Sequence, residues 1–329
     1  MTVRNLDYLL RPRSVALIGA SDREHSVGTA VMRNLLDGGF RGPIFPVHAT
    51  RRSVAGVHAY RDVGSLPQTP DLAVICTPPD SVADLVRALG IRGTRAVAIL
   101  TDGVPHEPVL DAARPRLVRI LGPDSMGLLV PGLGLNASFA PTPAQPGSLA
   151  FVSQSGALLA AALDWAATRR IGFTHAVSLG NAADVDTADV LDFLGGDTAT
   201  RAILVYVESV RSGRKFLSAA RAAARGKPLI VMKAGRTRVL DGRRARAPRG
   251  GRAAGGGRAG VRDPGSGRAG FPADPRIPAQ SGSAAGSPGI GRGRLRTGRA
   301  GRATSARAGA RRRPRAAQTR AWCARSFRI

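Results

Sequence analysis

The sequence has 329 residues, 43% of them hydrophobic, which is enough for two or three domains with a sizeable core. Its formal net charge of +27 is unevenly distributed along the chain. Residues 1–237 hold 26 Lys+Arg and 19 Asp+Glu, whereas residues 238–329 hold 23 Arg and three Asp. An argument from charge for nucleic-acid binding therefore rests on the second segment alone. No apolar run reaches the length of a signal peptide or membrane span, and the two cysteines have neither disulfide nor metal spacing, so we expect a cytoplasmic protein without a membrane role.

Short apolar runs alternate with segments of helical period from residue 14 onward, which is typical of a parallel sheet with crossover helices. The predicted strands cover 14–18, 43–47, 72–76, 96–100 and 117–121. The first predicted helix, 27–39, repeats apolar residues at helical spacing and ends at a Gly pair, and a second covers 80–89.

Polar and glycine-rich turns follow several of these strands. Residues 19–22 (GASD) join the first strand to a helix, so backbone N–H groups and a helix N-terminus face the carboxyl end of that strand, as an anion site requires. This is not the nicotinamide fingerprint, because Ser21 and Glu24 stand where glycines are needed. The turns 77–80, 101–103 and 122–125 follow three further strands, and ligands of open sheets bind at that edge.

Residues 129–147 are rich in Pro and Gly, and we expect the junction between two domains there. A second α/β run follows, with strands predicted at 148–152, 175–179, 202–207 and 228–233 and helices at 156–169, 187–194 and 214–224. The acids Asp184, Asp186, Asp189 and Asp192 fit an acid-rich helix N-terminus better than a metal site, so we assign no metal.

Residues 238–329 consist largely of Arg, Gly, Ala and Pro without hydrophobic periodicity, and we expect a low-complexity, disordered tail. All three lysines, all five histidines and every glutamate precede this segment. A change of reading frame near codon 237 is our hypothesis for the break, and resequencing the gene there tests it.

Six motifs carry a family resemblance: LIGASD, CTPPDS, GPDSMGL, FVSQSGAL, SLGNAADVDTADVLDFL and KAGRT. In order and spacing they resemble the NDP-forming acyl-CoA synthetases, which include the ADP-forming acetate–CoA ligases and, more remotely, the succinyl-CoA synthetase α subunit. The resemblance covers nearly all of residues 8–237. MRNLLDGGFRGPIFPV, GLNASF and SAARAAARGKPLIVMKAGR are most similar to the N-terminal region of bacterial protein lysine acetyltransferases, in which a GNAT domain follows a ligase-like region.

The resemblance implies an α/β protein with three parts. Residues 1–135 would form a Rossmann-like CoA-binding domain, residues 146–237 a truncated flavodoxin-like domain of the succinyl-CoA synthetase type, and residues 238–329 the tail. The implied cofactor is coenzyme A or acetyl-CoA, and ATP or ADP would be used only by the complete family protein. The residues implied to bind CoA are Gly19, Ala20, Ser21, Thr77, Pro78, Pro79, Thr101 and Ser125. The family usually has Asn where Asp124 stands and often Pro where Ala49 stands.

In the second domain the resemblance implies that Ser153, Gln154, Ser155 and Gly156 bind phosphate where a phosphorylated histidine docks, and that Glu208 hydrogen-bonds that histidine. The family reaction runs from acyl-CoA through acyl phosphate and phosphohistidine to ADP. Its histidine lies in a loop after the KAGRT strand, where this sequence has none. A solvated strand-end carboxylate is the alternative interpretation of Glu208.

Three hypotheses for function follow. The first is a CoA-binding portion of an acetate–CoA ligase or ligase-like acetyltransferase that cannot complete the reaction alone, because the phosphohistidine and ATP-grasp regions are missing. The second is a subunit of a split ligase, completed by an ATP-grasp chain. The third, less favoured because the tail has few aromatics, is nucleic-acid binding by the Arg-rich tail.

Overall fold

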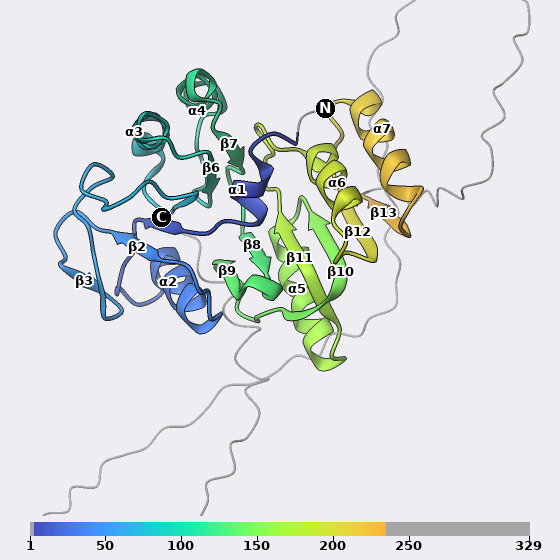
Figure 1. The fold of residues 1–329 in the computed structure, drawn as a ribbon, viewed down its shortest axis with the longest axis horizontal. Coiled ribbons are helices and arrows are strands. Elements are labelled where there is room, and N and C mark those ends of the chain that lie inside the picture. The colour runs from blue at the N-terminus through green and yellow to red at the C-terminus, as the bar shows by residue number, and fades with distance from the viewer. Residues whose placement is uncertain (1–2, 235–329) are drawn as a thin grey trace, which may run out of the picture. The chain divides into compact units, whose positions relative to one another are not determined.

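The computed structural model describes residues 3–234, and the tail prediction and the frame-shift hypothesis lie outside these residues. Five parallel strands form the first sheet in the order β2-β1-β5-β6-β7. They are β1 (Val15–Ile18), β2 (Ile44–Val47), β5 (Leu72–Ile75), β6 (Ala96–Ile99) and β7 (Arg119–Leu121). The helices are α1 (Leu6–Leu10), α2 (Val27–Asp37), α3 (Val82–Arg92) and α4 (His106–Ala113) (Figure 1). The Rossmann-like α/β class predicted from the alternation is confirmed.

Burial explains why these strands read as continuous apolar runs. All four residues of β1, β5 and β6 are buried, since helices cover both faces of the sheet. Alternate residues of β1 contribute to two different clusters, Val15 and Leu17 with α2 and Ala16 and Ile18 with α3. Three elements were not predicted from the sequence: α1, α4 and the short hairpin of β3 (Ser53–Val54) and β4 (Val57–His58).

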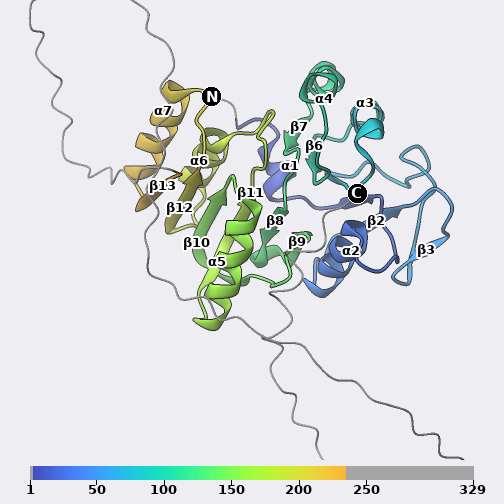
Figure 2. The ribbon, with the colours of Figure 1, turned by 180° about the vertical axis from the view of Figure 1, so that it is seen from behind.

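The second sheet has the order β13-β12-β10-β11-β8-β9. Its parallel strands β10 (Gln145–Ser153), β11 (Gly172–Ser178), β12 (Ala202–Val207) and β13 (Leu229–Lys233) agree with the prediction. On β10, Phe151 packs toward α5 (Gly156–Thr168), and the neighbouring Ala150 and Val152 pack on the opposite face, toward α6 (Thr187–Gly196) and α7 (Gly213–Ala224). The sheet therefore has helices on both faces, and Figure 2 shows α5 against it.

The segment expected to be an irregular junction is in part a hairpin. Strands β8 (Gly127–Val130) and β9 (Leu135–Ser138) pair with each other, and β8 adds antiparallel to β11. Pro131 and Gly134 form the turn between them, with Gly134 at φ +67°. The chain therefore passes from the first sheet to the second between β7 and β8, just before residues 129–147, the Pro- and Gly-rich stretch where we expected the junction between the domains.

An ion network ties β7 to the second sheet's helices. Arg119, whose side chain is 7% exposed, contacts Asp184 through Nε at 2.8 Å and Asp189 through a terminal nitrogen at 3.2 Å. Lys215 of α7 lies 3.0 Å from Asp186 and 2.8 Å from Asp189. Burial raises the pKa of Asp189, against the opposing effects of Lys215 and Arg119. Lys215 and Arg119 therefore stabilise the ionised Asp189 carboxylate, which burial alone would disfavour.

A buried histidine predicts acid sensitivity. His175 of β11 is 3% exposed, and within the described residues neither ring nitrogen has a hydrogen-bond partner. Burial lowers the pKa of the His175 imidazole from 6.5 to about 4, although nearby Asp197 opposes the shift. The unfolded chain therefore binds a proton at a higher pH than the folded chain does, and stability falls as the pH drops from about 6.5 toward 4.

We expect this effect to reach about 2–3 kcal/mol between pH 7 and pH 4.5. Urea unfolding at both pH values measures it, and His175→Leu should remove most of the difference. Asp197 does not interfere in this window. Burial alone would raise the pKa of its carboxyl, but the hydrogen bonds from Thr200 and Arg11 and the charge of Arg11 lower that pKa from 3.8. An equal loss of stability in wild type and variant would contradict the assignment.

Candidate functional site

The strand order of the first sheet reverses between β1 and β5. From β1 the chain passes to β2 on one side, and the later strands lie in sequence on the other. In open α/β sheets such a switch point leaves a crevice at the carboxyl ends of the strands, where ligands bind. The turns after β1 and β5, which hold Gly19 and Thr77, lie at this place.

Two glycines let backbone segments approach closely here. Gly19 has φ +87°, and an added Cβ would lie 3.0 Å from the Cys76 carbonyl group. At Gly28, in the first turn of α2, an added Cβ would lie 2.0 Å from the Gly19 oxygen. Ser26 caps α2 by accepting a hydrogen bond from the Thr29 amide. The N-terminus of α2 is therefore held directly against the turn after β1.

The neighbouring strand ends are joined by hydrogen bonds. Thr101, after β6, donates its hydroxyl to the Thr77 carbonyl at 2.7 Å. The Asp124 amide, after β7, donates to the Thr101 carbonyl at 3.0 Å. Pro79 lies beside Gly103, 3.9 Å from the position of an added Cβ there. The structure thus brings together the predicted residues at the ends of β5 and β6.

The remaining predicted CoA residues differ in accessibility. Ala20 is fully buried, Ser21 is half-buried and its hydroxyl accepts from the Arg23 amide, and Pro78 is exposed. Ser125 is 1% exposed, and its hydroxyl donates to the Ser178 carbonyl of β11 at 2.6 Å. The Ser125 side chain therefore joins the segment after β7 to β11 of the second sheet.

Two carboxylates stand at the same edge. Partial burial raises the pKa of Asp124, and the charge of Asp102 raises it further. Asp22 in the turn after β1 is engaged elsewhere, accepting from the Ala55 amide at 2.8 Å and from Arg51 at 3.1 Å. Carboxylates near a polyanion repel it, so Asp102 and Asp124 weaken the attraction that the helix N-terminus offers.

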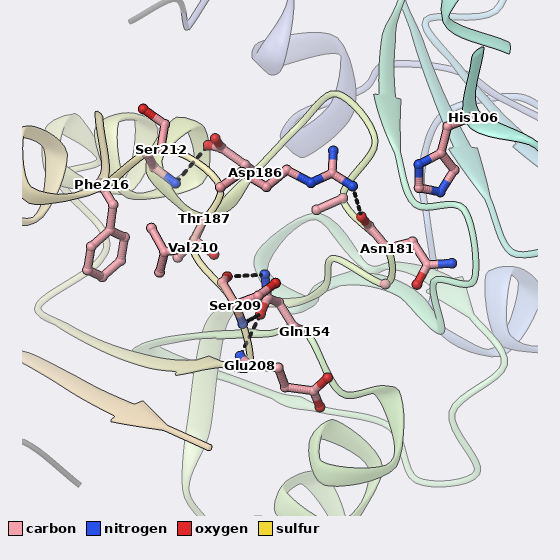
Figure 3. A pocket seen from close by; sticks show the side chains of 14 residues that line it. His106, Gln154, Asn181, Asp186, Thr187, Glu208, Ser209, Val210, Ser212 and Phe216 are labelled. Carbon is pink, nitrogen blue, oxygen red and sulfur yellow. Dashed lines mark hydrogen bonds between the residues drawn. The ribbon is translucent and has the colours of Figure 1, made fainter. Parts of the chain in front are cut away.

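A pocket of about 280 Å³ opens at the carboxyl ends of the second sheet's strands (Figure 3). It is lined by His106, Gln154, Gly180, Asn181, Ala182, Asp186, Thr187, Ala188, Glu208, Ser209, Val210, Arg211, Ser212 and Phe216. The loops after β10, β11 and β12 and the start of α6 all contribute. Carboxyl ends of parallel strands and a helix N-terminus meet here, as they do in the first domain.

The residues predicted to bind phosphate have structural partners in this region. The Gln154 side-chain oxygen accepts from the amides of Glu208 and Ser209 at 2.6 and 2.9 Å, which fixes the loop after β12. Ser155 caps α5 by accepting from the Leu158 amide, and the buried Ser153 donates to the Ser155 carbonyl. Gln154 and Glu208 line the pocket, whereas Ser153, Ser155 and Gly156 do not.

The aspartates at the start of α6 form a cap. Asp186 accepts hydrogen bonds from the amides of Ala188 and Asp189, and the Asp189 side chain accepts from the Asp186 amide, completing a capping box. This agrees with the prediction of an acid-rich helix N-terminus. Across the described residues, no group of three or more His, Cys, Asp or Glu side chains has a metal-binding arrangement.

Two family models match successive parts of the chain. Residues 13–131 match the family model of a CoA binding domain, and residues 146–259 match that of a succinyl-CoA ligase like flavodoxin domain. The α subunit of acetate–CoA ligase [ADP-forming] I of Pyrococcus furiosus is 38% identical over 246 residues, which are 71% of this chain and 53% of that protein. The chain therefore contains a CoA binding domain and a succinyl-CoA ligase like flavodoxin domain, and it is homologous to ADP-forming acetate–CoA ligase α subunits.

Two further relatives support this homology. The 4-hydroxybutyrate–CoA ligase [ADP-forming] of Nitrosopumilus maritimus is 34% identical over 70% of this chain and 34% of its own length. Acetyl-coenzyme A synthetase 1 of Candidatus Korarchaeum cryptofilum, solved with phosphate and ADP, has a TM-score of 0.68 and 36% identity, covering 70% of this chain and 52% of that one. The chain spans about half the length of the α-subunit relative. The closer resemblance to acetyltransferases stays a prediction.

Several residues of the pocket were not predicted from the sequence, among them His106, Asn181 and Arg211. Arg211 donates to the carbonyls of Asn181 and Ala183 at 2.9 and 3.3 Å and so joins the loops after β11 and β12. The only available signal was that polar residues follow each strand of the second sheet. Which of them face one pocket depends on loop conformations that have no local pattern.

Proposed function

We propose that this chain supplies the CoA-binding part of an ADP-forming acyl-CoA ligase. The observation that carries the proposal is the linked set of strand ends at the switch point of the first sheet. Gly19, with Ala20 and Ser21, would receive the CoA phosphates beside the N-terminus of α2. Thr77, Pro78, Pro79 and Thr101 would border the rest of the cofactor, and Ser125 would support the site from behind through Ser178.

In the second domain we propose that the pocket beside Gln154 and Glu208 receives the phosphoryl group. In the family reaction, phosphate attacks the acyl-CoA thioester, CoA leaves as its thiol, and the phosphoryl group of the acyl phosphate passes by way of a histidine to ADP. Glu208 would accept a hydrogen bond from that histidine, while Ser153, Ser155 and Gly156 would shape the helix start behind it.

We further propose that the complete reaction needs another chain carrying an ATP-grasp region. The name of the Pyrococcus relative, a subunit alpha, indicates that this relative has a further subunit. We also propose that the protein acts in the cytoplasm on a soluble CoA ester. None of the helices in the described part of the chain has the length and apolar character needed to cross a bilayer.

Calorimetric titration of CoA into the full-length chain tests the proposal. The experiment needs about 0.3 M salt, because residues 238–329 carry 23 arginines and would otherwise attract any polyanion. We expect saturable binding of CoA at one site, with NAD, which shares the adenosine diphosphate part of CoA, as a non-binding control. Equal binding of CoA and NAD, or binding of neither, would contradict a CoA site.

A further inference from the structure

Only one of the 14 residues lining the second-domain pocket comes from the first domain. His106 begins α4, which follows β6, and its ring reaches the pocket on the side where Asn181 lies (Figure 3). Gln154 and Glu208 approach from the strands of the second sheet. The pocket is therefore complete only when both domains are present.

Several polar side chains of the pocket are already engaged. Asp186 caps α6 and lies 3.0 Å from Lys215, Gln154 holds the loop after β12, and Arg211 donates to two carbonyl groups. Within the described residues, the His106 imidazole and the Glu208 carboxylate have no hydrogen-bond or ion-pair partner. These two side chains are the titratable groups of the pocket that remain free to contact a ligand.

The position of His106 is fixed by the residues before it. Val104 is 6% exposed and belongs to the core of the first domain, and Pro105 precedes the helix with φ −63°. Thr101, five residues before His106, is hydrogen-bonded to Thr77 at the proposed CoA site. One short loop therefore borders both sites, and its histidine lies at the phosphoryl end.

We propose that His106 is a binding residue of the phosphoryl pocket, donating a ring N–H to an oxygen of phosphate or of an acyl phosphate. The inference rests on the proposed function and deepens it, since it assigns a contact to a residue of the CoA-binding domain. The Asn181 amide is the neutral donor on the same side, and Glu208 remains available to a histidine from elsewhere. Closure of the pocket by a residue of the CoA-binding domain would place the phosphoryl group next to the thioester.

Titration of the full-length chain with inorganic phosphate at about 0.3 M salt tests this, followed through the ring Cε1–H signals of the five histidines by NMR. We expect one histidine signal to shift saturably and to be missing in His106→Ala. That variant should bind phosphate about 10- to 100-fold more weakly, as expected for loss of a hydrogen bond to a charged group. His106→Gln, which keeps a donor, should recover part of the affinity.

His58→Ala, at an exposed histidine of the same domain, is the matched control and should bind phosphate as the wild type does. Unchanged phosphate affinity in His106→Ala would overturn the role of His106 while leaving the pocket in place. Failure of the wild type to bind phosphate would overturn both the inference and the proposed phosphoryl pocket, and the CoA titration would still decide the first site separately.

Discussion

Replacing Arg119 with methionine is expected to lower the free energy of unfolding by about 3–5 kcal/mol, the range for removing one partner of a buried ion pair. The guanidinium is 7% exposed and contacts Asp184 and Asp189, whose side chains are 28% and 2% exposed. Methionine fills much of the space, so the loss would report the uncompensated carboxylates more than a cavity. Lys215 remains beside Asp189 and should keep the loss toward the lower end.

Arg114 offers a matched control for this prediction. It too lies near two carboxylates, those of Glu107 and Asp111, but its own side chain is 63% exposed. Because exposed ion pairs contribute little, Arg114→Met should change stability by no more than about 1 kcal/mol. Urea unfolding, monitored by circular dichroism, compares the free energies of unfolding of the two variants. Similar losses in both variants would mean that Arg119 does not hold the two sheets together.

Gly28→Ala is expected to weaken CoA binding about 10- to 100-fold, the effect of losing a hydrogen bond between a backbone amide and a charged phosphate. Helix propensity alone would favour the substitution by about 1 kcal/mol. The added Cβ, however, would lie 2.0 Å from the Gly19 oxygen, so α2 must move away from the turn that it supports. Overpacking of this kind costs about 1–3 kcal/mol and outweighs the gain in propensity.

Gly132→Ala separates this effect from a general cost of adding a methyl group. An added Cβ at Gly132 meets no atom within 4 Å, and this residue lies in the turn between β8 and β9. The Gly132→Ala variant should have the same affinity for CoA and the same unfolding midpoint as the wild type. If Gly28→Ala binds CoA as tightly as Gly132→Ala does, the affinity for CoA does not depend on the position of α2.

The sequence predicted the strand ends of the first sheet well, because each buried strand is a short apolar run with an unambiguous polar turn after it. Gly19, Thr77 and Thr101 are neighbours simply because adjacent parallel strands end at one edge. The hairpin of β8 and β9 was missed, since Pro131 and Gly134 occupy its tight turn and resemble a linker.

Tertiary contacts account for the other differences. Ser125 stays in the proposed CoA site, but the sequence could not predict that its hydroxyl donates to the Ser178 carbonyl, more than fifty residues later in the chain. His106 has no local motif and enters the pocket only because α4 begins beside the second sheet. Neither fact is encoded in hydrophobic period or turn chemistry.

Hydrogen–deuterium exchange of the full-length chain with and without CoA, read by mass spectrometry at about 0.3 M salt, tests the central claim most directly, because it locates the ligand as well as detecting it. We expect CoA to slow exchange in peptides that contain residues 19–29, 76–81 and 101–103, with little change in α5 or α7. Protection confined to residues 238–329, or no protection at the ends of β1, β5 and β6, would contradict a CoA site in the first domain.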